Sequence, residues 1–254
     1  EYLSAYDKKE VDSEIHLQKP FEKMHDITKP YSIASNESTE DNTYLSYNKV
    51  IGTSLDEKLY LAFQILDYAL LSAPGAPITK ALLEAGIGKD IMGGFDNSTL
   101  QPIFSVVAKN ANKEDEEKFV GIIEDTLKKI VKDGLNRKSL LAGINSEEFK
   151  FREADYGNFP KGLIYGLSCM DSWLYDDDEP FLYLKILDVF AALKEKIETG
   201  YFEELIRKYL LENTHGAIVL IKPEKGRTAR MDKELQEKLQ AYKESLTEEE
   251  RKEL

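Results

Sequence analysis

The apolar run AIVLI at residues 217–221 constrains the fold of this chain more than any other feature. It lies within the segment HGAIVLIKP, from His215 to Pro223, and no polar residue interrupts it. A short run that is apolar at every position is typical of a strand with neighbours on both sides, not of a half-exposed strand. We therefore expect this segment to be a central strand of a sheet.

Two predicted hairpins precede this strand. Residues 31–35 (YSIAS) and 42–52 (NTYLSYNKVIG) are strand candidates joined by the polar loop NESTED, so they indicate a first hairpin. Residues 90–111 contain a glycine pair, a turn at DNS and a strand candidate at 103–108, which indicate a second.

Helical patterns occupy most of the remaining chain. Ser54, followed by Glu57 three residues later, predicts a capping box and the start of an apolar helix. That helix ends at SAPGAP, residues 72–77, because proline cannot continue the hydrogen-bond ladder. Further helices are expected at 78–85, 112–134, 136–154 and 229–254, with two or three more between 161 and 213.

This order of elements predicts an α+β fold, with a single mixed or antiparallel sheet covered on one face by helices. Residues 1–29 are polar and interrupted by proline, so they are expected to be a linker or strap. Residues 30–223 are expected to be the folded domain, and residues 224–254 a helical extension. A start at Glu1 and an end within the charged run LTEEERKEL fit a piece of a longer chain.

Composition excludes several classes of partner. The formal net charge is −13, which disfavours nucleic acid because phosphate binding needs clustered Lys and Arg. Ordinary solubilising surface charge is the simplest explanation of this acidity. The single cysteine excludes a disulfide within the chain and favours the cytoplasm or an organelle matrix. Apolar runs are too short for a membrane span, so no membrane partner is expected.

A search for catalytic or metal-binding residues finds none. His16, His25 and His215 do not have the H-x-x-E-H or H-E-x-x-H spacing of a zinc site. The acidic run YDDDEP at 175–180 lacks the alternating ligands of a calcium loop and is interpreted as a solvated turn. Cys169, within an apolar helical segment, is expected to be a buried, inert thiol.

Three long segments carry a family resemblance. They are residues 44–90 (YLSYNKVIG to AGIGKD), 93–134 (GGFDNST to IVKDG) and 210–226 (LLENTHGAIVLIKPEKG). In this order they resemble the second, non-catalytic domain of presequence-protease-like zinc metallopeptidases of the pitrilysin and insulinase families. The resemblance extends from about residue 31 to the end of the chain.

The resemblance implies a parent enzyme whose zinc lies in another domain. It implies a metallopeptidase-clan, pitrilysin-like fold. In the parent enzyme, four domains of this fold would form two halves around a closed chamber. A helical connection between the halves would begin near residue 224. Zinc-bound water would hydrolyse unfolded peptides there. This chain would be inactive alone, and its partners would be the catalytic first domain, the C-terminal half and the peptide substrates. A non-enzymatic scaffold or peptide-binding module of the same fold is the alternative.

The same resemblance points to residues 72–78 as a substrate-binding exosite. The candidates are Ser72, Ala73, Pro74, Gly75, Ala76, Pro77 and Ile78. Small side chains let another chain approach the backbone, where an extended peptide can bind by strand addition. The other interpretation is that glycine and proline here only turn one helix into the next.

Overall fold

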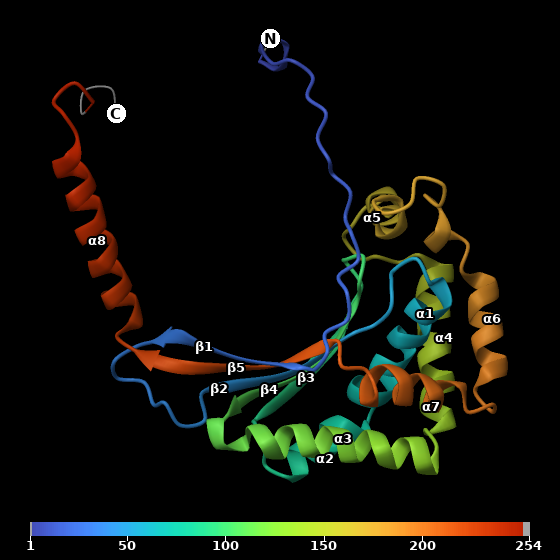
Figure 1. Ribbon diagram of the computed structural model, residues 1–254. Coiled ribbons are helices and arrows are strands. Elements are labelled where there is room, and N and C mark those ends of the chain that lie inside the picture. Colours follow the sequence, from blue (N-terminus) through green and yellow to red (C-terminus); the bar gives the residue numbers. More distant parts are fainter. Residues whose placement is uncertain (1, 251–254) are drawn as a thin grey trace.

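The computed structural model describes residues 2–250 of the chain (Figure 1). Its strands are β1 (His25–Ile33), β2 (Thr43–Val50), β3 (Asp90–Asp96), β4 (Ile103–Ala111) and β5 (Gly216–Lys225). Its α-helices are α1 (Glu57–Asp67), α2 (Pro77–Glu84), α3 (Glu116–Asp133), α4 (Arg137–Glu153), α5 (Lys161–Trp173), α6 (Leu187–Lys196), α7 (Tyr201–Leu205) and α8 (Arg227–Ser245). Shorter helical turns are η1 (Leu3–Ala5), η2 (Tyr68–Ser72), η3 (Lys113–Asp115), η4 (Leu182–Leu184) and η5 (Ile206–Leu211).

The strands form one mixed sheet in the order β1-β5-β2-β4-β3. β5 is parallel to β1, and the other pairs are antiparallel. β5 therefore has a neighbour on each side, which confirms the central position predicted from its apolar run. The hairpin of β3 and β4 is confirmed as well.

The first predicted hairpin is wrong. β1 and β2 do not pair with each other, because β5 lies between them. The apolar run of β5 needs partners on both edges, and the two early strands supply them from either side. β1 also begins at His25, inside the segment expected to be a strap, so the sheet takes in residues before position 30.

The core lies between this sheet and a layer of helices (Figure 1). Alternate residues of the central strands point into it, and Leu45, Tyr47, Phe104, Val106 and Leu220 are fully buried there. From the helices, the core includes Phe63, Phe119, Ile123, Leu127 and Phe190. The α+β architecture with helices on one face is therefore confirmed.

Two helix starts follow the chemistry of their caps. α1 is capped by the carboxylate of Asp56, which accepts the N–H of Leu59 at 2.9 Å, so the predicted cap at Ser54 is wrong by two residues. Ser54 is instead buried, and its hydroxyl has no hydrogen-bond partner among the described residues. Asn136 caps α4, as predicted.

The two ends of the described chain extend away from the body (Figure 1). Apart from η1, the leader before β1 has no helix or strand and runs from the sheet away from the body, and α8 projects from the end of β5. None of the described residues of α8 is buried, and its predicted apolar stripe, including Leu235, Leu239 and Tyr242, is exposed. No described helix is long and apolar enough to cross a membrane.

Candidate peptide-binding site

Residues 73–76 form a tight turn between η2 and α2. The N–H of Ala76 donates to the carbonyl of Ala73 at 2.8 Å, and Gly75 has a φ of 73°. Proline at the second position and glycine with positive φ at the third are the residues that a type II turn requires. The glycine and proline of this loop are thus explained by turn geometry, whether or not a peptide binds there.

The structure divides the seven predicted site residues into two groups. Ala73, Ala76 and Ile78 are buried, and Ile78 belongs to the core. Pro77 is half-buried at the start of α2. Ser72, Pro74 and Gly75 are exposed and are the residues of the loop most accessible to a ligand.

An open sheet edge lies close to this loop. β3 is one of the two edge strands, β1 being the other, and no other described strand pairs with its outer side. Gly93 of β3 lies so close to Leu71, the residue before the loop, that an added Cβ would be 3.1 Å from the Leu71 Cδ1. Leu71, which precedes residues 72–76, therefore packs against the middle of β3, and the outer edge of this strand offers backbone to an incoming strand.

The uncovered face of the sheet has a polar, hydrogen-bonded centre. The hydroxyls of Ser46 and Ser105 donate to the Asn48 side-chain oxygen at 3.0 and 2.7 Å. The amide of Asn48 donates to the Ala217 carbonyl at 3.2 Å. Small side chains tied to one another in this way give a polar surface against which a peptide can lie.

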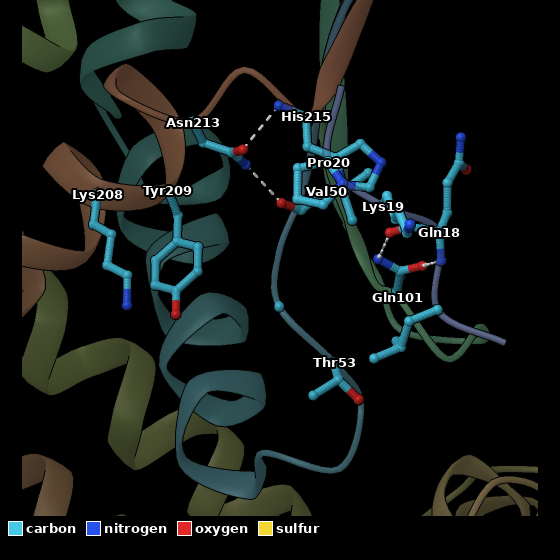
Figure 2. A pocket seen from close by; sticks show the side chains of 12 residues that line it. Gln18, Lys19, Pro20, Val50, Thr53, Gln101, Lys208, Tyr209, Asn213 and His215 are labelled. Carbon is cyan, nitrogen blue, oxygen red and sulfur yellow. Dashed lines mark hydrogen bonds between the residues drawn. The ribbon is translucent and has the colours of Figure 1, made fainter. Parts of the chain in front are cut away.

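A cavity of about 560 Å³ lies where the leader meets the body (Figure 2). Its lining residues are Leu17, Gln18, Lys19, Pro20, Val50, Gly52, Thr53, Gln101, Lys208, Tyr209, Asn213 and His215. The side-chain oxygen of Gln101 accepts the Gln18 N–H at 2.7 Å, and its side-chain nitrogen donates to the Gln18 carbonyl at 3.2 Å. One side chain therefore binds both backbone polar groups of Gln18.

Two titratable side chains near this cavity are buried. Lys49 is 2% exposed, and its ammonium donates to the Asn213 carbonyl at 2.6 Å, without an ion-pair partner among the described residues. Burial lowers the pKa of Lys49 to about 8. Burial also lowers the pKa of His215, whose ring lies 4.6 Å from that of Phe21.

We predict that Gln101→Ala loosens the leader. The variant loses both hydrogen bonds to Gln18, each worth about 1 kcal/mol. The amide of Gln18 should then exchange with deuterium roughly tenfold faster or more, whereas the amides of β4 keep their wild-type protection. An unchanged exchange rate at Gln18 would show that other contacts are sufficient to hold the leader in place, such as the 2.6 Å hydrogen bond from the Thr214 hydroxyl to the Phe21 carbonyl.

The residues surveyed for metal binding are not brought together. His16 is exposed beside Glu14, and the rings of His25 and His215 both pack against that of Phe21, at centroid distances of 4.2 and 4.6 Å. Within residues 2–250, no group of three or more His, Cys, Asp and Glu has a geometry that could hold a metal ion. Cys169 is half-buried, so its predicted burial is wrong.

Sequence reasoning missed two parts of this region. It placed the exosite only at residues 72–78 and did not identify the edge of β3, although the GG pair at 93–94 is a signal of close backbone approach. It also missed the buried ammonium of Lys49, because alternation along β2 marks the position as inward-facing but does not say that a lysine there lacks a partner.

Comparison with known proteins identifies the family. A family model described as Peptidase M16 inactive domain matches residues 1–146, and the chain belongs to this family. The chain is thus a non-catalytic domain of a peptidase-like protein.

Two curated relatives extend the match over nearly the whole chain. Protein HypA of Clostridium perfringens is 44% identical over 98% of this chain, which covers 25% of that protein. Presequence protease 1, chloroplastic/mitochondrial, of Arabidopsis thaliana is 32% identical over 95% of this chain and 23% of that protein. The chain therefore spans about a quarter of the length of these relatives.

Solved structures show the same fold. The peptidase M16 inactive domain from Pseudomonas fluorescens matches with a TM-score of 0.56 at 15% identity, over 87% of this chain and 48% of that one. A putative zinc protease from Bordetella pertussis matches with a TM-score of 0.57 at 9% identity, over 72% of this chain and 95% of that one.

Proposed function

We propose that this chain is a wall and substrate-binding domain of a zinc-dependent oligopeptidase whose metal is held by a different domain. An inactive domain implies a catalytic partner, and relatives named as proteases are about four times as long as this chain. Residues 1–29 would connect to the catalytic domain, and residues 224–254 would begin the connection to the C-terminal half. The parent protein would act in the cytoplasm or an organelle matrix.

The observation that carries the peptide-binding role is the open edge of β3 beside an exposed, rigid turn. A strand edge presents unpaired N–H and C=O groups, which an extended peptide can pair with regardless of its sequence. Ser72, Pro74 and Gly75 are exposed in the turn that follows Leu71, and none has a bulky side chain to obstruct a peptide. The polar face around Asn48 would form part of the chamber wall.

Strand addition predicts a specific requirement for peptide N–H groups. A fluorescent, unstructured peptide should bind the chain, and the same peptide with every second nitrogen methylated should bind at least about tenfold more weakly. Both peptides have the same side chains, so fluorescence anisotropy isolates the backbone contribution. Equal affinity of the two peptides would exclude strand addition.

A protein variant localises the binding. Ser72→Trp places a bulky side chain on the exposed part of the loop and should weaken capture of the unmethylated peptide about tenfold. Glu195→Trp, at an exposed position of α6, adds the same bulk elsewhere and should bind as the wild type does. Gly75→Val is a poor test, since a φ of 73° strains any β-branched residue.

The scaffold alternative makes a different prediction about the parent protein. An H-x-x-E-H motif in the sequence preceding this segment would support a peptidase, and its absence would support a non-enzymatic assembly subunit.

A further inference from the structure

The cavity where the leader meets the body has an excess of positive charge, although the protein is acidic (Figure 2). Lys19 and Lys208 line this leader cavity and no Asp or Glu does, while the whole chain has a formal net charge of −13. Neither lysine makes an ion pair among the described residues, and the Lys208 ammonium lies 4.7 Å from the centre of the Tyr209 ring. Both ammonium groups are therefore available to an anion.

His215 supplies an unpaired polar group in the wall of the leader cavity. The residue is 5% exposed, yet its imidazole makes no hydrogen bond among the described residues and packs against the ring of Phe21. Its backbone N–H is satisfied separately, by the side-chain oxygen of Asn213 at 2.8 Å. Burial lowers the pKa of His215, so the ring is neutral at pH 7 and has one N–H to donate. A buried polar group ordinarily has a partner, and a ligand in the cavity would provide one.

A third cation lies behind the wall of the leader cavity. The ammonium of Lys49 donates to the carbonyl of Asn213, a residue that lines the cavity. With a pKa of about 8, Lys49 is protonated at pH 7. The carboxylate whose charge acts on it is that of Glu124, which is itself paired with Lys128 at 3.3 Å. Because charges are screened less in a poorly solvated site, Lys49 adds to the positive potential of the cavity.

The remaining lining suits a small molecule with an apolar body. Leu17 and Pro20 come from the leader, and Val50 comes from the end of β2. The volume of about 560 Å³ lies within the range of about 300–1,000 Å³ that is usual for small-molecule sites. No arginine and no helix N-terminus lines the cavity, and these are the groups that often bind phosphate. The lining therefore favours a carboxylate as the anionic group.

We propose that the leader cavity binds a small molecule that has an apolar body and one carboxylate group. The carboxylate accepts a hydrogen bond from the His215 imidazole and is attracted by the ammonium groups of Lys19 and Lys208. Because residues 17–20 form one wall of the cavity, the bound molecule holds the leader against the body. None of residues 72–78 lines the cavity, and the proposal does not depend on strand addition there.

Octanoate is the probe that tests this proposal, with its affinity for the whole chain measured by isothermal titration calorimetry. Octanamide has the same apolar body without the charge, and acetate has the same charge without the apolar body. Octanoate should bind at least about tenfold tighter than either, and added salt should reduce its advantage over octanamide. Equal binding of octanoate and octanamide, or no binding of octanoate, would overturn the proposal.

Two double variants place the charge contribution at the cavity. Lys19→Gln with Lys208→Gln should weaken octanoate binding about tenfold and lower its salt dependence. Lys185→Gln with Lys238→Gln removes the same charge at positions that do not line the cavity, and should change binding less than about twofold. All four lysines are exposed, so circular dichroism should report an intact fold. Equal effects of the two pairs would show that octanoate responds to net charge and not to this site.

A pair of substitutions at Leu17 tests the wall that the leader contributes. Leu17 is 58% exposed, so either substitution should leave the fold intact. Leu17→Asp and Leu17→Asn introduce side chains of nearly the same size, and they differ in charge. The aspartate variant should bind octanoate at least about tenfold more weakly than the asparagine variant, because its carboxylate repels that of the ligand. Equal affinities would remove the leader from the site.

Hydrogen exchange reports whether the ligand holds the leader. Saturating octanoate should slow deuterium exchange of the Gln18 and Lys19 amides several-fold and leave the amides of α3 unchanged. Unchanged exchange at both leader amides would place the ligand elsewhere.

Two further measurements separate this site from peptide binding. Ser72→Trp should bind octanoate as the wild type does, so failure of this proposal and failure of strand addition are distinguishable. The unmethylated fluorescent peptide should not displace octanoate. Displacement would make the C-terminal carboxylate of a peptide the occupant and would overturn the assignment to a small molecule.

Discussion

Replacing Gly216 with alanine is expected to lower the free energy of unfolding by about 3 kcal/mol. Gly216 begins β5 and lies against β2, where an added Cβ would be 2.2 Å from the backbone oxygen of Asn48. That oxygen belongs to the neighbouring central strand and cannot move aside without breaking the ladder between β2 and β5. Urea unfolding followed by circular dichroism measures the change.

Gly94 supplies the matched control for this prediction. It lies in β3 of the same sheet, but an added Cβ there meets no atom within 4 Å. Gly94→Ala should therefore change stability by less than about 0.5 kcal/mol. Equal effects of the two substitutions would show that the close approach of β5 to β2 is not what requires glycine at position 216.

Lys49→Met is expected to stabilise the protein at pH 7 and to change how stability depends on pH. Burial lowers the pKa of Lys49 from 10.5 to about 8, so the folded protein binds this proton more weakly than the unfolded chain does. Unfolding therefore takes up a proton between these two values, and the free energy of unfolding rises with pH across that window. Between pH 7 and pH 9.5, this group should raise the free energy of unfolding of the wild type by about 2 kcal/mol.

The methionine variant lacks the titrating group and should not gain this increment. At pH 7 it should be about 1–2 kcal/mol more stable than the wild type, because the relief from burying a cation exceeds the loss of the hydrogen bond to Asn213. Measurements should stop near pH 9.5. Burial raises the pKa of Tyr47, and the stability that such a tyrosine contributes is lost as pH rises above 10. Parallel pH profiles of the two proteins would contradict this account of Lys49.

Most of the secondary structure was predictable because local signals are strong here. The cap at Asn136, the glycine after α3 and the apolar run in β5 act within a few residues of where they stand. Pairing of β1 was not predictable in this way. Neighbouring strands in the sequence suggest a hairpin, whereas the actual partner of β1 lies nearly 200 residues away.

The candidate peptide site was predictable only in part. Residues 73–76 signal a turn by composition, but their exposure depends on how η2 and α2 pack, and that packing buried Ala73, Ala76 and Ile78. Helix α5 shows the same limit. Its apolar spacing is visible in the sequence, and the ordinary inference from such spacing is a buried face, but Leu167 is 55% exposed.

The sequence by itself determined the α+β class, the family and the central position of β5. It also determined that the three histidines lack a zinc-binding spacing. Each of these results follows from residue types at short range. Only the tertiary structure decided that β5 separates β1 from β2 and that β3 is left as an open edge near Leu71. It also decided that Lys49 is buried without an ion pair among the described residues and that α5 faces outward. These features depend on which distant segments pack together, and burial is a property of the whole fold.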